Sequence, residues 1–352
     1  MKSGSLKNIK NAKQLHERGL ISEERIEGIE EVASRFSLSI TNEMADLIEE
    51  GDDPIARQFV PSVKELNVTE DELADPIGDN ARSPVKGIVH RYPDRCLFMP
   101  MTVCPVYCRF CFRREKVGSA ESGLSRKELE AAFAYIESTP QIWEVILTGG
   151  DPLFMKPNLM KRIISRLSSI DHVDVIRLHT RVPVVDPKRV NGEMLKALNT
   201  DKALYVVLHA NHVREFSKEA KKTIAKLVDS GIPMLSQSVL LKGINDDPAA
   251  LENLFRELVR NRVKPYYLHH GDFAKGTSHF RTTIEEGRNL MKKIRGKVSG
   301  LCQPTYALDI PGGYGKAPIN PDYLSEDEDG SYVVEDYRGV KHRYPQSPRQ
   351  AP

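Results

Sequence analysis

Three cysteines stand within eight residues of this sequence, at the spacing C-x3-C-x2-C: Cys104, Cys108 and Cys111. Three thiolates on one loop can bind three irons of a [4Fe–4S] cluster, whereas clusters held only by cysteine normally have four protein ligands. One iron would then stay open to a further ligand. The spacing therefore predicts a metal cluster that takes part in chemistry.

A zinc site, a disulfide and plain buried cysteines are the alternatives for these residues. A zinc site usually needs two ligand pairs, and no second pair stands nearby. The sequence has only five cysteines in 352 residues and does not open on a signal peptide, so we expect a reducing, cytoplasmic compartment. The cluster is the leading prediction, and Cys96 and Cys302 are expected to be buried structural thiols.

The charge balance bears on the partners of the protein. There are 51 basic and 49 acidic residues, which give a net charge of +2. No apolar run approaches the roughly 20 residues that a membrane-spanning helix needs. We therefore expect neither a nucleic-acid partner nor a membrane partner.

The elements that must position the cysteines follow from the hydrophobic pattern. Apolar, β-branched-rich segments alternate with amphipathic ones, which indicates parallel βα units. The sequence predicts an α/β fold, a partial (β/α)6-type barrel like a TIM barrel. Strands are expected over residues 96–103, 143–148, 173–178, 203–209, 234–241, 265–270 and 301–308. Helices are expected over residues 125–138, 159–168, 192–198, 215–230, 249–261 and 284–294.

Three regions divide the chain in this interpretation. Residues 1–75 form a helical N-terminal extension, 76–318 the barrel core and 319–352 a C-terminal tail with a hairpin over 332–335 and 340–344. Proline and glycine between 75 and 95 predict extended connecting chain. In barrels of this kind chemistry gathers at the C-terminal ends of the strands. The cysteines follow the first predicted strand, Gly149, Gly150 and Asp151 the second, and Gln237 lies in the fifth.

The cysteine motif, with Phe110 before its last cysteine and a barrel around it, resembles the radical S-adenosylmethionine (SAM) enzymes. The resemblance implies that SAM binds the open iron and is split into a 5′-deoxyadenosyl radical. It also implies that the turn at Gly149, Gly150 and Asp151 approaches the amino group of SAM, because glycine permits close backbone approach. His209 matches a position near SAM, although a histidine at a strand end is often simply hydrogen-bonded.

Four further motifs narrow the resemblance: HRYPDR at 90–95, QSVLL at 237–241, HFR at 279–281 and DIPGGYGK at 309–316. Their order and spacing are similar to the lysine 2,3-aminomutase family. This implies an isomerase that uses pyridoxal 5′-phosphate (PLP) with the radical chemistry and moves the α-amino group of L-lysine from C2 to C3, giving β-lysine.

The family also implies roles for the PLP site. Lys316 would form the Schiff base with PLP, which needs a reactive neutral amine and a glycine-rich chain around a phosphate-bearing ring. Arg91 and Arg95 would bind the phosphate, for which a planar guanidinium is suited. Their alternative is an ion pair with Asp94 or another carboxylate. Gln237 would approach the pyridine ring, or is an ordinary polar strand residue.

Substrate choice rests on two aspartates in the same comparison. Asp272 and Asp309 match the positions that bind the distal ammonium of lysine, and Arg113 the position that binds its α-carboxylate. A pair of carboxylates suits a buried cation and would repel the side chain of glutamate. The alternative for either aspartate is a loop cap.

Several rival functions stay open from the sequence. Phe110 and Phe112 are shared with relatives that modify elongation factor P, so the substrate is either lysine, another lysine-like amino acid or a lysine side chain of that factor. A radical SAM enzyme without PLP, including one that modifies nucleic acid, and an iron–sulfur redox protein are the other classes. The resemblance further implies a homo-oligomer and a reduced flavodoxin- or ferredoxin-type electron donor.

Overall fold

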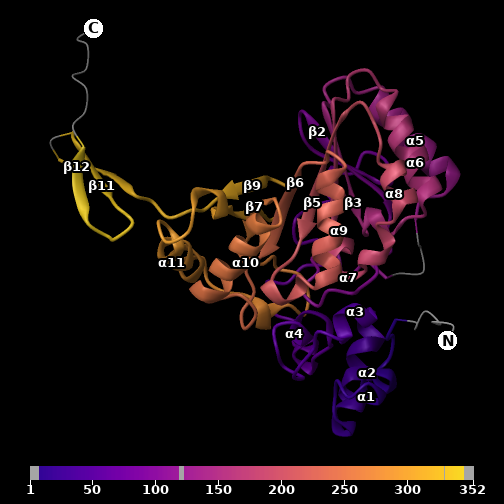
Figure 1. Ribbon diagram of the computed structural model, residues 1–352, viewed down its shortest axis with the longest axis horizontal. Helices are drawn as coiled ribbons and strands as arrows, with labels where there is room; N and C mark the ends of the chain where they lie inside the picture. The colour runs from indigo at the N-terminus through magenta and orange to yellow at the C-terminus, as the bar shows by residue number, and fades with distance from the viewer. Residues whose placement is uncertain (1–7, 119–122, 329, 345–352) are drawn as a thin grey trace.

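A single nine-stranded sheet organises the chain (Figure 1), and its strands follow one another in sequence order from β1 to β9. The computed structural model describes residues 8–118, 123–328 and 330–344. Strands β2 to β8 pair in parallel, β1 pairs antiparallel with β2, and β9 antiparallel with β8. The strands are β1 Ile88–Tyr92, β2 Arg95–Met101, β3 Glu144–Gly149, β4 Val175–Thr180, β5 Ala203–His209, β6 Met234–Val239, β7 Val263–His269, β8 Thr305–Ile310 and β9 Gly315–Pro318.

Helices follow most of the parallel strands, as the alternating pattern predicts. Capping boxes at Ser125 and Thr283 begin α5 and α11, where each side chain accepts a backbone N–H that the helix leaves unpaired. Figure 1 shows α1 to α4 gathered at one end of the molecule. The helices are α1 Ala12–Glu17, α2 Ile26–Arg35, α3 Asn42–Ala45, α4 Ala56–Phe59, α5 Arg126–Glu137, α6 Pro157–Ser168, α7 Val182–Val185, α8 Gly192–Ala197, α9 Lys218–Asp229, α10 Pro248–Arg260 and α11 Ile284–Ile294.

The structure confirms the barrel-like α/β fold and every strand and helix predicted after residue 95, within a few residues at each end. The region 75–95 differs from the prediction, because it contains β1 and is not only connecting chain. β9 was also not predicted, since its glycine and proline content disfavours strands. Cys302 is buried as expected but lies in a 3₁₀ turn and not in a strand.

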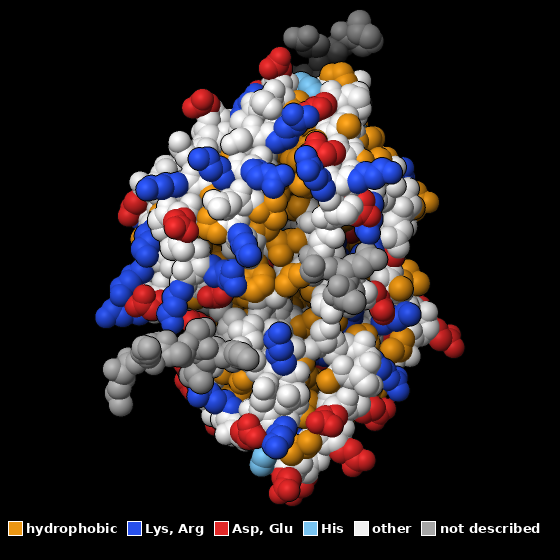
Figure 2. Space-filling view, turned by 90° about the vertical axis from the view of Figure 1, so that its right-hand side faces the viewer, with side chains coloured by type: hydrophobic (Ala, Val, Ile, Leu, Met, Phe, Trp, Pro, Cys, Tyr) orange, Lys and Arg blue, Asp and Glu red, His pale blue; other side chains and the backbone are white. Residues whose placement is uncertain are grey.

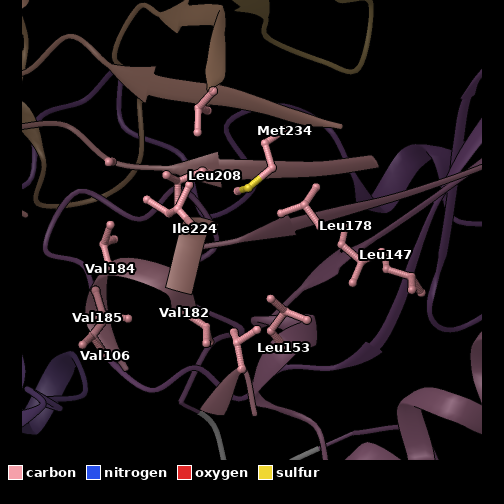
Figure 3. Close-up of a cluster of buried hydrophobic side chains, with 14 of the residues drawn as sticks. Val106, Leu147, Leu153, Leu178, Val182, Val184, Val185, Leu208, Ile224 and Met234 are labelled. Carbon is pink, nitrogen blue, oxygen red and sulfur yellow. The ribbon is translucent and has the colours of Figure 1, made fainter. Parts of the chain in front are cut away.

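The two faces of the sheet carry different side chains, because successive residues of a strand point to opposite faces. On β4, Ile176 and Leu178 are buried, whereas Arg177 and His179 line a cavity. Figure 3 shows part of the apolar core that the outward residues form with α7, α9 and the chain near the cysteines: Val106, Leu147, Leu153, Leu178, Val182, Val184, Val185, Leu208, Ile224 and Met234. The sheet thus packs its outer face on helices and leaves its inner face for polar side chains.

A small antiparallel sheet lies at the edge of the molecule in Figure 1, and Glu335 of this sheet forms an ion pair with Lys292 of α11 at 2.5 Å. The predicted hairpin is present as β11 Tyr332–Glu335 and β12 Lys341–Tyr344, and β10 Leu324–Glu326 adds a third strand. Residues 1–7 and 345–352 of the predicted extension and tail lie outside the described residues. Within the described chain no helix is long and apolar enough to span a membrane. Basic and acidic side chains are interspersed over the face drawn in Figure 2.

Candidate active site

A cavity of about 690 Å³ runs along the inner face of the sheet, from the cysteine loop to the start of β3. Its walls come from seven parallel strands and the β8–β9 hairpin. The fourteen residues singled out in the sequence all line this one cavity: Arg91, Arg95, Cys104, Cys108, Cys111, Arg113, Gly149, Gly150, Asp151, His209, Gln237, Asp272, Asp309 and Lys316. Residues spread over more than two hundred positions are therefore neighbours in space.

A buried ion pair fixes the cysteine loop. Arg109, between the second and third cysteines, is fully buried and donates from Nε to Glu65 Oε1 at 2.9 Å and from Nη2 to Glu65 Oε2 at 2.6 Å. Arg114, just beyond the last cysteine, binds the same carboxylate. Burial alone would raise the pKa of Glu65, but the charges of Arg109 and Arg114 hold that pKa below its usual value. The N-terminal region thus holds the loop that carries the cysteines.

The three thiols line one cavity, and Cys108 has a cation beside it. Arg181 Nη1 donates to Cys108 Sγ at 3.0 Å, and its Nη2 donates to the buried Glu215 at 2.7 Å. Burial raises the pKa of the Cys111 thiol to about 11, so metal binding must ionise it. No three ligand side chains of the described residues converge on a single ion. A [4Fe–4S] cluster has no such requirement, because each thiolate binds a different iron.

The glycine turn after β3 sits against the start of the cysteine loop. A Cβ on Gly150 would lie 2.4 Å from the carbonyl oxygen of Val103, and Gly149 has φ +98°, so both positions require glycine. The carboxylate of Asp151 accepts from Thr180 Oγ1 and from the Arg181 amide, each at 2.6 Å. Burial raises the pKa of Asp151 to about 6. The Asp151 carboxylate is therefore occupied by hydrogen bonds within the protein. A ligand at this turn would meet the backbone atoms of the glycines.

The β8–β9 hairpin brings Lys316 to Asp309. The two residues are directly opposed in the antiparallel ladder, and Lys316 Nζ forms an ion pair with the Asp309 carboxylate. The Lys316 amide donates to the Tyr92 hydroxyl at 2.7 Å. A Cβ on Gly315, where φ is +100°, would lie 2.8 Å from that hydroxyl. Glycine at this position therefore lets the hairpin rest on Tyr92.

The two arginines that are predicted to bind the phosphate have different partners. Arg91 lies between Asp309 Oδ1 at 3.4 Å and Asp79 Oδ1 at 3.1 Å, and its buried Nε has no hydrogen-bond partner in the described chain. Arg95 pairs with Asp94 at 2.5 Å, so both arginines form ion pairs with carboxylates, the alternative that the sequence left open. Arg91 therefore offers an unused donor to an anion, whereas the Nη1 of Arg95 is engaged.

Asp272 differs from Asp309 and Asp151 in the same cavity because its carboxylate has no direct partner in the described chain. Its carboxylate forms no hydrogen bond or ion pair with the residues that the structure describes, although the charges of Lys316 and Arg113 act to lower its pKa. Burial, with the negative charge of Asp309 second, raises the pKa of Asp272 to about 7. The loop that carries it is held by Glu72, which accepts from the Gly276 amide at 2.7 Å and from Arg281 at 2.8 Å. A rigid loop thus presents an unpaired carboxyl group to the cavity.

Two neutral histidines face the same space. His209 lies opposite Gln237 in the β5–β6 ladder, and His179 lies on β4. The Nε2 atoms of both histidines are buried without a hydrogen-bond partner in the described residues. Burial lowers the pKa of both rings well below the usual value. Unpaired buried polar atoms are rare in proteins, so we interpret these as ligand contacts.

Sequence reasoning missed several residues of this site: Glu65, Asp79, Tyr92, His179 and Arg181. Glu65, Asp79, Tyr92 and Arg181 act through partners that are distant in the sequence, and His179 through a buried Nε2 that has no partner in the described residues. Tyr92 and Arg181 were within or near recognised segments. The others carried no signal in a single sequence.

Comparison with known proteins gives two family matches. The model of the radical SAM superfamily matches residues 98–255, and the lysine-2,3-aminomutase model matches residues 291–351.

Named relatives agree with these matches. An L-lysine 2,3-aminomutase of Methanococcus maripaludis is 41% identical over 90% of this chain and 74% of its own. One of Clostridium subterminale is 35% identical over 92% of this chain and 78% of its own. A glutamate 2,3-aminomutase of Clostridioides difficile is 38% identical over 85% and 71%. A solved radical SAM methyltransferase from Sphaerobacter thermophilus is 18% identical over 63% of this chain and 68% of its own, with a TM-score of 0.46.

Proposed function

Because this chain belongs to the lysine 2,3-aminomutase family of radical SAM enzymes and is therefore an isomerase, we propose that it converts L-lysine into β-lysine. The observation that carries the proposal is the unpaired carboxyl group of Asp272 beside Asp309 in the cavity that the cysteines also line. A buried carboxyl group without an ion-pair partner favours a cationic side chain over an anionic one, even though the charges of Lys316 and Arg113 act on it.

The radical SAM family binds a [4Fe–4S] cluster and SAM. We propose that Cys104, Cys108 and Cys111 hold the cluster and that the Gly149–Gly150 turn, with His209, contacts SAM. The tight approach of Gly150 to Val103 and the unpartnered Nε2 of His209 support these assignments. Reduced flavodoxin or ferredoxin is the proposed electron donor, and the homo-oligomer stays a prediction.

PLP is the third proposed cofactor, and it supplies a conjugated ring over which an unpaired electron beside the migrating nitrogen is delocalised. We propose that Lys316 is its covalent anchor, that Arg91, through its unused Nε, and Arg95 bind its phosphate, and that Gln237 contacts its ring. Asp309 holds the Lys316 ammonium in the free protein. The hydrogen-bonded hairpin keeps that group on the inner face of the sheet.

Different residues of the protein then bind the two ends of the lysine substrate. We propose that Arg113 binds the α-carboxylate, since it lines the cavity just beyond the last cysteine. Asp272 and Asp309 receive the distal ammonium, which gives Asp272 the cation that the free protein lacks. Two fixed ends orient C2 and C3, where the amino group moves, toward the SAM site.

The test is anaerobic reconstitution of the full chain with iron, sulfide, SAM, PLP and dithionite, followed by chromatography of the amino acids. β-Lysine should accumulate from lysine and no β-glutamate from glutamate. The Lys316→Ala variant should form none and should lose the borohydride-fixed PLP label. If lysine stays unchanged while the Methanococcus maripaludis relative converts it in the same buffer, the proposal is wrong. Incubation with elongation factor P then tests the protein-bound lysine as substrate.

A further inference from the structure

An unbroken chain of alternating charges crosses the cavity wall. It runs Arg113, Asp79, Arg91, Asp309, Lys316, and each neighbouring pair is in contact. Under the proposed function its first member binds one end of the substrate and its fourth member binds the other. The residue without a role in that function is Asp79, which links the two ends.

Asp79 uses both carboxylate oxygens for this link. Oδ2 accepts from Arg113 Nε at 2.9 Å, and Oδ1 accepts from Arg91 Nη2 at 3.1 Å. The side chain of Asp79 is 2% exposed. Although burial alone would raise its pKa, the charges of Arg113 and Arg91 hold the pKa of Asp79 below the usual value. Asp79 is therefore a fixed anion between two cations.

The backbone around Asp79 is seated on the hairpin that carries Lys316. A Cβ on Gly78 would lie 2.4 Å from the amide nitrogen of Gly313, so the two segments touch backbone to backbone. The Asp79 amide also donates to Asp75 Oδ1 at 2.9 Å. The carboxylate of Asp79 thus shares one rigid frame with Lys316 and Asp309, and it fixes Arg113 to the same frame.

We propose that Asp79 is a positioning residue that sets the distance between the two substrate anchors and so selects lysine by its length. This inference rests on the proposed function. Asp79 occupies Nε and Nη2 of Arg113, and the Nη1 of Arg113 has no partner among the described residues. The α-carboxylate binds that free nitrogen, at a fixed separation from Asp272 and Asp309. A substrate one methylene shorter, such as ornithine, cannot reach both ends.

The experiment compares lysine with ornithine in the wild type, Asp79→Asn and a control. Asp186→Asn is the matched control, because Asp186 also forms an ion pair with an arginine, Arg189, at 3.0 Å but does not line the cavity. Two quantities are measured on the full chain: the kcat/KM ratio of the reconstituted enzyme, and the ratio of dissociation constants by calorimetry without turnover.

We expect the wild type and the control to favour lysine by about 10–200-fold, the discrimination typical of one methylene. Asp79→Asn should lose on the order of tenfold of that preference, because Arg113 can then follow the shorter substrate. An Asp79→Asn protein that keeps the wild-type ratio would overturn the inference, even where its affinity or melting temperature falls.

A second variant, Asp79→Glu, keeps the inference testable if Asp79→Asn folds poorly. Asp79→Glu keeps the charge but lengthens the link between Arg91 and Arg113, so it changes the separation between the guanidinium of Arg113 and the ammonium site. The ratio of lysine to ornithine binding should differ from that of the wild type, and an unchanged ratio again contradicts the inference. If the proposed function is wrong, the wild type does not convert lysine. In that case the ratio of the dissociation constants for lysine and ornithine, measured by calorimetry, still tests the role of Asp79.

Discussion

Replacing Asp272 by asparagine should stabilise the protein while it weakens substrate binding. Burial, and secondly the charge of Asp309, raises the pKa of Asp272 from 3.8 to about 7. A carboxyl group whose pKa is higher in the folded state costs stability once the pH exceeds its unfolded pKa, and the cost stops growing above its folded pKa. The asparagine variant removes this cost because its amide does not ionise.

The magnitude follows from the size of the shift. At about 1.4 kcal/mol per pH unit, the charge of Asp272 costs about 1.6 kcal/mol at pH 5 and about 4 kcal/mol at pH 8. Asp272→Asn should therefore gain more than twice as much unfolding free energy at pH 8 as at pH 5. In substrate binding the sign reverses, since loss of one carboxylate beside a buried ammonium typically costs about 2–5 kcal/mol.

Urea unfolding of the cofactor-free protein at pH 5 and pH 8 measures the first effect, and kcat/KM for lysine measures the second. Asp201→Asn is the control, because Asp201 is exposed and its substitution should change neither quantity. A destabilised Asp272→Asn protein, or a gain that is equal at the two pH values, would show that Asp272 is not an uncompensated charge. The assignment of the ammonium site to it would then fail.

Three further predictions concern other parts of the site. KM for lysine should rise about fivefold as the pH falls from 7 to 6, because Asp272 becomes protonated; initial rates of the reconstituted enzyme measure this. Glu65→Gln should lower the unfolding free energy by about 3–5 kcal/mol and reduce the iron content, because it leaves Arg109 charged and buried without its anion; urea unfolding and iron analysis are the measurements. Gly150→Ala should abolish SAM binding in calorimetry, because the added methyl group would overlap the Val103 carbonyl; wild-type affinity would contradict the packing described for this turn.

The sequence was informative about the fold where periodicity is strong. The strands β2 to β8 are apolar and bounded by turn residues, so their positions could be predicted. β1 could not, because Ile88–Tyr92 is short, has only two buried residues and follows a stretch rich in proline and glycine. Its strand conformation comes from pairing with β2, which is a tertiary effect.

Some residues of the site could also be predicted from local patterns, whereas others could not. Cysteine spacing and the glycine-rich motif before Lys316 are local patterns, and both were visible in one sequence. Asp79 and Glu65 were not, because their partners lie 34 and 44 residues further along the chain in Arg113 and Arg109. A buried ion pair leaves no periodic trace, so only the folded chain shows which carboxylates hold the site together.

The register of the β8–β9 hairpin has a consequence for how this protein can change. Asp309 and Lys316 face each other because four residues, 311–314, join their strands. Side chains alternate between faces along a strand, so one inserted or deleted residue would turn Lys316 away from Asp309 and out of the cavity. Tyr314 is 74% exposed, which leaves its identity free to vary, whereas Gly312 and Gly313 have φ of +85° and +84° and require glycine. Position 314 can therefore change while the length of the connection stays constant, and a length variant of this loop should keep its fold and lose its PLP.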